Sequence, residues 1–273
     1  MKPAMPPEAM PTVIALHSSA ASGRQWQPLA TALAATHRVV APDLHGHGDG
    51  PPPPAGVSIV AADTQRVVRL VLASPPGVHL VGHSYGAAIA LRVARRCGAR
   101  LASLSLVEPV AFRLLFDRYR RARPAAEILE TARALHVLLR SGAAARAAER
   151  FVTYWGGSPA WSRLGPDARA AVAVRMPAVA AQFDGLAAGD FTLDDCRAID
   201  VPALLLAGTA TRAPALRIAE LVASALPHVN DERLPDGTHV EALESPARIV
   251  RRIAQFVGEI DARTGATSLQ AAA

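Results

Sequence analysis

The segment Val78–Ala87 of this 273-residue chain reads Val-His-Leu-Val-Gly-His-Ser-Tyr-Gly-Ala. Its apolar first half is typical of a buried strand, and it leads directly into Gly-x-Ser-x-Gly centred on Ser84. Glycine at both flanks allows a tight turn, because it adds no side chain where the backbone doubles back. The alanine-rich residues Tyr85–Cys97 predict a helix. Ser84 is therefore a candidate nucleophile at a helix N-terminus, where the positive end of the helix dipole favours a developing anion.

Short apolar runs alternate with helical patterns on both sides of this turn. Strands are predicted at 12–16, 38–41, 78–81, 101–107, 202–208 and 229–234, and helices at 26–35, 57–73, 85–97, 213–226 and 246–258. This alternation predicts right-handed βαβ crossovers. We therefore expect an α/β fold with a mostly parallel, doubly wound sheet flanked by helices. The 51% apolar content suits a sheet that is buried on both faces.

The alternation is interrupted between residues 110 and 198, where the pattern is helical and indicates no strand. We predict that this segment is a helical lid inserted into one core domain, which is formed by residues 12–109 and 199–260. The proline-rich residues 1–11 and the tail 261–273 are expected to be flexible termini.

Charge and cysteine content narrow the classes of partner. The formal net charge of +6 comes almost entirely from arginines spread through predicted helices without interleaved aromatic residues, so we expect no nucleic-acid partner. Cys97 and Cys196 have neither metal-ligand nor redox spacing, which favours a reducing compartment. No segment resembles a secretory signal or a membrane span. We expect a cytoplasmic protein with a small-molecule substrate and no membrane insertion, and the oligomeric state stays open.

His239 is the candidate base for Ser84. Serine is a weak nucleophile at neutral pH and needs a base to take its proton. His239 follows the last predicted strand in the loop 235–239, so it comes late enough for the chain order nucleophile, acid, histidine. His17 and His83 lie in other segments of the expected site, and we interpret them as shaping their loops.

Taken together, these motifs resemble the α/β-hydrolase superfamily, in its single-domain, lidded branch of esterase-like and C–C-hydrolase-like enzymes. The resemblance covers residues 12–257 and includes His-Ser-Ser at 17–19, Asp-Leu-His-Gly-His-Gly at 43–48 and Gly-Thr-His at 237–239. It implies an α/β-hydrolase fold and an oxyanion hole built from the backbone N–H groups of Ser19 and Tyr85. The chain has His-Ser where relatives usually have His-Gly, which changes the side chain in the loop but keeps the backbone donors.

The acid of the triad departs from the usual pattern. Relatives usually carry an aspartate shortly after the strand before last, but residues 206–213 contain no carboxylate and Thr211 stands at the customary position. Glu108 ends the strand 101–107 on the edge of the sheet where Ser84 is expected. Some relatives, the haloalkane-dehalogenase-like ones among them, carry their acid there. We predict that Glu108 orients His239; the alternative is that it caps the strand or pairs with an arginine of the lid.

These residues predict a serine hydrolase that acts through an acyl-enzyme, with a Ser-His-Glu triad, on an ester or thioester of a small, largely apolar substrate. No metal or organic cofactor is expected. Serine at position 84 argues against an epoxide hydrolase or dehalogenase, which need a carboxylate there. A C–C bond hydrolase, a cofactor-free lyase and a non-catalytic small-molecule-binding protein of this fold remain alternatives. Aromatic residues of the lid are interpreted mainly as core rather than pocket: Phe112, Phe116, Tyr154, Trp155, Trp161 and Phe183.

Overall fold

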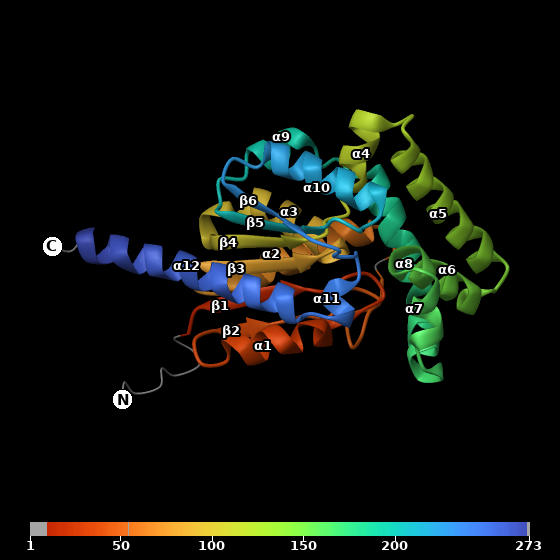
Figure 1. Cartoon of the computed structure of the whole chain (residues 1–273), viewed down its shortest axis with the longest axis horizontal. Helices are drawn as coiled ribbons and strands as arrows, with labels where there is room; N and C mark the ends of the chain where they lie inside the picture. The colour runs from red at the N-terminus through yellow and green to blue at the C-terminus, as the bar shows by residue number, and fades with distance from the viewer. Residues whose placement is uncertain (1–9, 54, 272–273) are drawn as a thin grey trace.

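The computed structural model describes residues 10–53 and 55–271 (Figure 1). The described residues form a sheet of six strands, all parallel, in the order β2-β1-β3-β4-β5-β6. The strands are β1 (Thr12–Leu16), β2 (Arg38–Val40), β3 (Val78–His83), β4 (Leu101–Val107), β5 (Ala203–Gly208) and β6 (Val229–Leu234). The predicted parallel α/β fold is confirmed. The direction of strand addition reverses between β1 and β3, and ligands of open α/β sheets bind at the carboxyl ends of strands beside such a reversal.

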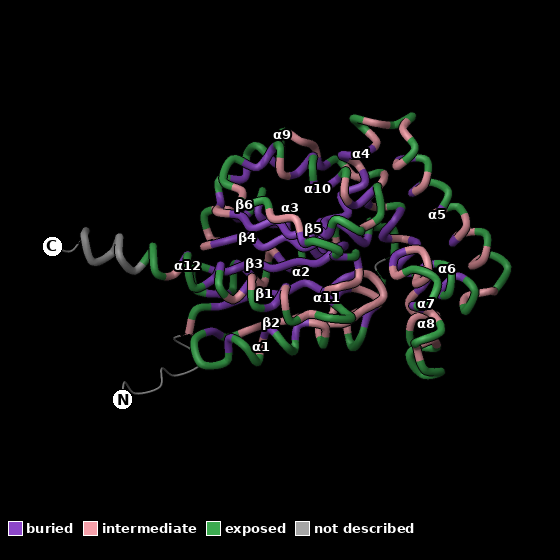
Figure 2. Tube along the Cα trace, viewed as in Figure 1, coloured by how far each residue is buried: buried purple, intermediate pink, exposed green. Residues whose placement is uncertain are grey.

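Helices cover both faces of the sheet. One face packs against α1 (Gln27–Leu33) and α12 (Ala247–Ala271), and the other against α2 (Ile59–Ala73), α3 (Tyr85–Cys97) and α10 (Ala213–Ala225). Short 3₁₀ turns, η2 (Gly23–Trp26) and η3 (Gly98–Arg100), precede α1 and β4. Figure 2 shows the central strands buried and the outer faces of the helices exposed.

The side chains of each apolar strand pack into two hydrophobic cores, one on each face of the sheet. In β1, Val13 and Ala15 belong to the core under α1 and α12, whereas Ile14 and Leu16 belong to the core under α2 and α3. Successive residues of a strand point to opposite faces, so a sheet that is covered on both sides needs apolar residues at every position. The edge strand β6 differs, because it has a neighbouring strand on one side only and carries exposed polar residues.

The segment between β4 and β5 contains helices joined by short turns and no strand. It contains α4 (Phe112–Tyr119), α5 (Arg123–Arg140), α6 (Ala144–Gly156), α7 (Ser158–Arg163), α8 (Pro166–Ala188) and α9 (Leu193–Arg197). Helices α5 to α8 gather at the end of the sheet opposite the two termini (Figure 1), which is the end where the parallel strands finish. Helix α8 also contacts α2, so these helices share a core with the sheet domain. In the part of the chain that the structure describes, no helix is both long and apolar enough to cross a bilayer.

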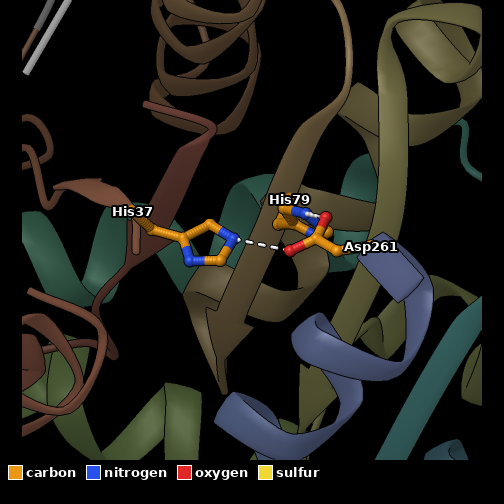
Figure 3. Close-up of side chains that lie close together, drawn as sticks. All are labelled: His37, His79 and Asp261. Carbon is orange, nitrogen blue, oxygen red and sulfur yellow. Dashed lines mark hydrogen bonds and ion pairs between the residues drawn. The ribbon is translucent and has the colours of Figure 1, made fainter. Parts of the chain in front are cut away.

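Helix α12 extends to residue 271, past the predicted helix end at residue 258, and the expected flexibility of residues 261–273 stays a prediction. Asp261 lies on α12 between two buried histidines (Figure 3). Its carboxylate oxygens accept hydrogen bonds from Nε2 of His37 at 3.0 Å and Nε2 of His79 at 3.1 Å. These contacts tie the helix to β3 and to the loop before β2 beyond the predicted end of the helix. The remaining terminal residues, 1–9 and 272–273, lie outside the described part of the chain.

The other ring nitrogen of each of these two histidines contacts a hydroxyl group. Nδ1 of His37 lies 2.8 Å from Oγ1 of Thr36, and Nδ1 of His79 lies 2.8 Å from Oγ of Ser103. The two imidazoles and Asp261 place three potential metal ligands within 4.8 Å of one another. Because both oxygens of Asp261 and all four ring nitrogens already have hydrogen-bond partners, we interpret this cluster as a clamp between helix and sheet.

Candidate active site

Ser84 occupies a strained turn between β3 and α3. Its φ is +54°, a left-handed conformation that costs a residue other than glycine about 1–3 kcal/mol. A side chain at Gly82 would collide with the backbone of Gly86, and one at Gly86 would collide with the carbonyl of Leu16. The Ser84 N–H donates to the carbonyl of Val107 on β4 at 2.8 Å, which fixes the turn against the sheet. The flanking glycines therefore permit a conformation that places the serine hydroxyl just beyond the carboxyl end of β3.

His239 meets Ser84 from the loop between β6 and α11 (Glu241–Glu244). Its Nε2 lies 2.9 Å from Oγ of Ser84, and both residues are at most 5% exposed. With the proton on Nδ1, Nε2 accepts the hydrogen bond of the serine hydroxyl, which is the arrangement that proton removal requires. The structure therefore brings together the predicted nucleophile and base.

Glu108 completes the line on the far side of the imidazole. Its Oε2 lies 3.1 Å from Nδ1 of His239, and the residue is 2% exposed. The Gly208 N–H donates to Oε1 at 2.6 Å and the Thr211 hydroxyl donates to Oε2 at 2.7 Å. Burial alone would raise the pKa of Glu108, but the hydrogen bonds and charge of His239, together with those two donors, lower it below its usual value. The group is thus held as a carboxylate that accepts a hydrogen bond from the Nδ1–H of His239.

Thr211 has a role that sequence reasoning missed. It stands where relatives usually carry the acid, and the structure turns its hydroxyl toward the replacement acid Glu108. The available signal was the threonine itself, at the customary acid position just before the helix that follows this loop. When the acid lies elsewhere, a hydrogen-bond donor at the empty position stabilises it, whereas a second carboxylate would disfavour its ionisation.

His83 positions the loop that carries the base. The Gln25 side-chain amide donates to Nδ1 of His83 at 2.9 Å, so Nε2 carries the proton and donates to the carbonyl of His239 at 2.9 Å. Burial and the neighbouring His239 lower the pKa of His83 to about 3, so the ring is neutral at physiological pH. Gln25 Oε1 also accepts from the N–H and hydroxyl of Ser18, at 3.0 and 3.2 Å. One glutamine thus links the loop after β1, the elbow and the base.

The loop after β1 is fixed by a second neutral histidine. His17 contacts the Ser18 carbonyl through Nδ1 at 2.8 Å, and its Nε2 accepts the Leu44 N–H at 3.0 Å. Burial and the nearby His47 lower the pKa of His17 to about 4. Because the Ser18 N–H donates to Gln25, the next N–H along, that of Ser19, is the one in this loop expected to serve an oxyanion.

The motif at 43–48 is linked by hydrogen bonds to the start of α3, next to the loop after β1. Asp63, fully buried on α2, accepts from the hydroxyl of Tyr85 at 2.7 Å and from the backbone and ring of His45 at 3.0 and 2.7 Å. The Tyr85 N–H begins α3, and β1 and β3 are neighbours in the sheet. The two expected oxyanion donors, Ser19 and Tyr85, therefore lie at the ends of adjacent strands.

Trp155 covers the base from the inserted helices. Its ring on α6 stacks on the imidazole of His239 with 3.9 Å between centroids and 25° between planes. Phe112 and Phe183 instead pack on each other in the core, with centroids 5.0 Å apart. The interpretation of the aromatic residues as core thus holds for these phenylalanines, whereas Trp155 has one face on the candidate site.

A cavity of about 310 Å³ opens beside Trp155 and is lined mostly by apolar side chains. Among its lining residues are Ser19, Ala20, Phe151, Trp155, Leu164, Val172 and Val240. It therefore joins the expected oxyanion loop to the inserted helices. A larger hollow of about 600 Å³ lies between α5 and α6 on the outer surface, and none of its lining residues belongs to the Ser84 cluster.

Comparisons with known proteins agree with the fold. A family model described as "Alpha/beta hydrolase family" matches residues 13–252. A putative carbamate hydrolase, RutD, of Variovorax paradoxus is 44% identical over 86 residues, which is 30% of this chain and 32% of that protein. The magnesium-chelatase 30 kDa subunit of Rhodobacter capsulatus is 34% identical over 87 residues, 31% of this chain and 30% of that protein. The chain thus spans about a third of the length of these curated relatives.

Solved structures resemble most of the chain. The enol-lactonase from Burkholderia xenovorans superposes with a TM-score of 0.71 at 20% identity, covering 91% of this chain and 92% of that one. At this level of identity the likeness shows the fold alone, so the chemistry has to be argued from the residues described above.

Proposed function

Because the chain belongs to the alpha/beta hydrolase family, we propose that it is a serine hydrolase with Ser84 as nucleophile, His239 as general base and Glu108 as the acid. The observation that supports this most strongly is the unbroken line of hydrogen bonds from Ser84 Oγ through His239 to Glu108, at 2.9 and 3.1 Å. Nucleophile, base and orienting acid in hydrogen-bond reach are what acyl transfer to a serine requires.

The reaction follows from these roles. Ser84 Oγ attacks the carbonyl carbon of an ester or thioester while His239 Nε2 takes its proton, and the N–H groups of Ser19 and Tyr85 hold the oxyanion. The tetrahedral intermediate expels the alcohol or thiol, which receives the proton from His239, and an acyl-serine remains. Water then gives its proton to His239 and attacks the acyl carbon. Collapse of this second intermediate releases the carboxylic acid and returns the proton to Ser84.

The cavity and the inserted helices support a largely apolar substrate. The space beside Trp155 holds about 310 Å³ and is lined mainly by apolar side chains, which favour a hydrocarbon acyl group over a polar one. We propose that residues 110–198 act as the lid over this space, since α6 and α8 both contribute lining residues.

Labelling with a fluorophosphonate tests the nucleophile. Ser84→Ala removes the attacking oxygen, so labelling is abolished and turnover of p-nitrophenyl esters falls by about three to six orders of magnitude. Ser105→Ala is the matched control, because Ser105 is equally buried but lies within β4. Labelling that persists at another residue in Ser84→Ala contradicts the assignment, whereas the control keeps both labelling and turnover.

A further inference from the structure

The clamp of His37, His79 and Asp261 brings three side chains that commonly bind metals to one point (Figure 3). One ligand atom of each residue lies within 4.8 Å of the other two, and in the described part of the chain no other group of three such residues is this close. The ligands come from the loop before β2, from β3 and from α12, so no local sequence motif reveals them. Two imidazole nitrogens and a carboxylate oxygen suit zinc and related divalent transition metals.

The distances within the clamp are close to those between the ligands of a small ion. Nε2 of His37 and Nε2 of His79 lie 3.0 and 3.1 Å from the carboxylate oxygens of Asp261. Bonds of about 2.0–2.2 Å from one ion to a nitrogen and an oxygen place those two atoms about 3.0 Å apart at a right angle and about 3.4 Å apart in a tetrahedron. Side-chain rotations that move the ligand atoms by about 1 Å are therefore enough for an ion to replace the two hydrogen bonds.

The outer nitrogen of each imidazole is held as in a metal-bound histidine. Nδ1 of His37 lies 2.8 Å from Oγ1 of Thr36, and Nδ1 of His79 lies 2.8 Å from Oγ of Ser103. A histidine that binds a metal through one nitrogen donates the N–H of the other to an oxygen, which fixes the ring and its tautomer. Both rings of the clamp have such an oxygen.

The Thr36 hydroxyl favours this tautomer for His37. It has one proton, and when it donates that proton to the Leu33 carbonyl, at 3.3 Å, its oxygen accepts from Nδ1 of His37. The lone pair of Nε2 then faces a carboxylate oxygen of Asp261 at 3.0 Å. Two lone pairs at this distance repel each other, and a cation that binds both removes the repulsion.

Asp261 gives the cluster its access to solvent. Its side chain is 39% exposed, whereas those of His37 and His79 are 5% and 1% exposed. An ion can therefore arrive at the carboxylate and keep water as a further ligand, while the two imidazoles bind it from the protein side. The pair of His228 and Asp200 differs, because both side chains lie at the surface and no second histidine belongs to it.

We propose that His37, His79 and Asp261 bind one Zn²⁺ or a chemically similar divalent ion, which fastens α12 to β3 and to the loop before β2. Each neutral imidazole binds through Nε2 and carries its proton on Nδ1, so binding moves a proton within each ring and releases none. His79 lies near the amino end of β3, whereas Ser84 follows the carboxyl end, five residues or about 16 Å further on. The ion is therefore structural, and the inference is independent of the proposed function.

Titration calorimetry with ZnCl₂ tests the site on the full chain, purified without a polyhistidine tag and treated with a chelator beforehand. We expect one ion per chain with a Kd of about 10 µM or tighter. His37→Gln and His79→Gln each remove one ligand and should weaken binding at least about tenfold. His228→Gln removes an imidazole that faces a carboxylate at the surface, so this control should keep the wild-type Kd.

Thermal unfolding separates the ion from the hydrogen bonds of the clamp. Each protein is compared with itself, with and without about 100 µM ZnCl₂, and the Tm should rise by about 5 °C in the wild type and His228→Gln but not in His79→Gln. If the variants at 37 and 79 do not fold, X-ray absorption of the zinc-loaded wild type decides, and it should show two imidazole ligands and no sulfur.

Three results overturn the site. They are a wild-type protein that binds no zinc at about 100 µM, an equal Kd in the wild type and His79→Gln, and an absorption spectrum with a sulfur ligand from Cys97 or Cys196 or with a single imidazole.

Discussion

Three donors converge on the carboxylate of Glu108 at the centre of the site. His239, Gly208 and Thr211 each donate one hydrogen bond to it, and the first of these fixes which nitrogen of the imidazole carries the proton. The other nitrogen is thereby left as the acceptor for Ser84. A charged acceptor strengthens such a bond and, in the proposed reaction, stabilises the imidazolium that forms on His239.

Glu108→Gln tests this role at constant side-chain volume. The amide cannot select the reactive tautomer or stabilise the imidazolium, so the maximal rate should fall by about two to four orders of magnitude while the fold remains. Glu127→Gln, an acid of the inserted helices that pairs with Arg212, is the control and should keep the rate. A Glu108→Gln rate within about threefold of the parent means that His239 works without this acid.

Restoring the customary acid position is the companion experiment. In the Glu108→Gln background, Thr211→Asp places a carboxylate where the threonine hydroxyl now meets residue 108, and part of the lost rate should return. In the wild-type background the same change brings two carboxylates together, which disfavours ionisation of both, so the rate should fall. Steady-state rates of the double and the two single variants decide between these outcomes.

Much of this site was predictable from local patterns, and the rest depended on packing between distant segments. Ser84 lies in a motif whose spacing alone sets a strand-to-helix turn, and His239 follows from chain order. The hydrogen bond from Thr211 and the stacking of Trp155 join residues that are far apart in sequence, and no local pattern encodes which side chain of a helix faces the site.

At the level of elements, helix α6 covers His239, the proposed base, through the ring of Trp155. Trp155→Ala opens the cavity next to the imidazole of His239, so the preferred acyl chain of p-nitrophenyl esters should become longer by several carbons. Trp161→Ala is the matched control, because that ring instead stacks against Arg169. The measurement is kcat/KM over a series from acetate to decanoate; an identical optimum in Trp155→Ala and the parent contradicts the role of this ring.

Helix α12 offers a stability prediction of its own. Asp261→Asn weakens two hydrogen bonds to buried imidazoles, so the free energy of unfolding should fall by about 1–3 kcal/mol. Asp200→Asn, which removes an acid from an exposed pair with His228, should change it by less than about 1 kcal/mol. Urea denaturation of the three proteins measures the difference, and equal midpoints show that the clamp contributes nothing.

The boundaries of elements show where pattern reading succeeds. Strands β1 and β4 and helix α3 begin and end where the sequence predicts, because an apolar run or an alanine-rich face is bounded by Gly, Pro or polar residues. The end of α12 was missed, since Asp261 reads as a polar tail residue until His37 and His79 are brought beside it. These contacts form only in the folded chain, so no local sequence pattern predicts them.

On the scale of the whole molecule, two buried neutral histidines make stability depend on pH. The pKa of His17 is lowered to about 4 and that of His83 to about 3, mainly by burial, so each ring binds a proton less readily when folded than when unfolded. Their contribution to stability is complete above pH 6.5 and is lost as the pH falls toward the folded values. By pH 5 each should have cost on the order of 2 kcal/mol.

Chemical denaturation at pH 7.5 and pH 5 checks this expectation. His17→Gln removes one of the two titrating rings, so its stability should differ less between the two pH values than that of the parent, whatever its absolute stability. His228→Gln, a change at an exposed ring, should keep the parent dependence. Equal pH dependence in the parent and His17→Gln would show that burial of this ring is not linked to the proton.

The order of the site along the chain has a consequence for biosynthesis. Ser19, Ser84 and Glu108 all precede the inserted helices, whereas His239 follows the last strand. Chains are synthesised from the N-terminus, so the ribosome completes the proposed nucleophile and its proposed acid before the histidine that we propose deprotonates the serine. Under the proposed assignment, a nascent chain therefore carries Ser84 without its base until β6 and the loop with His239 have been made and have docked on the sheet.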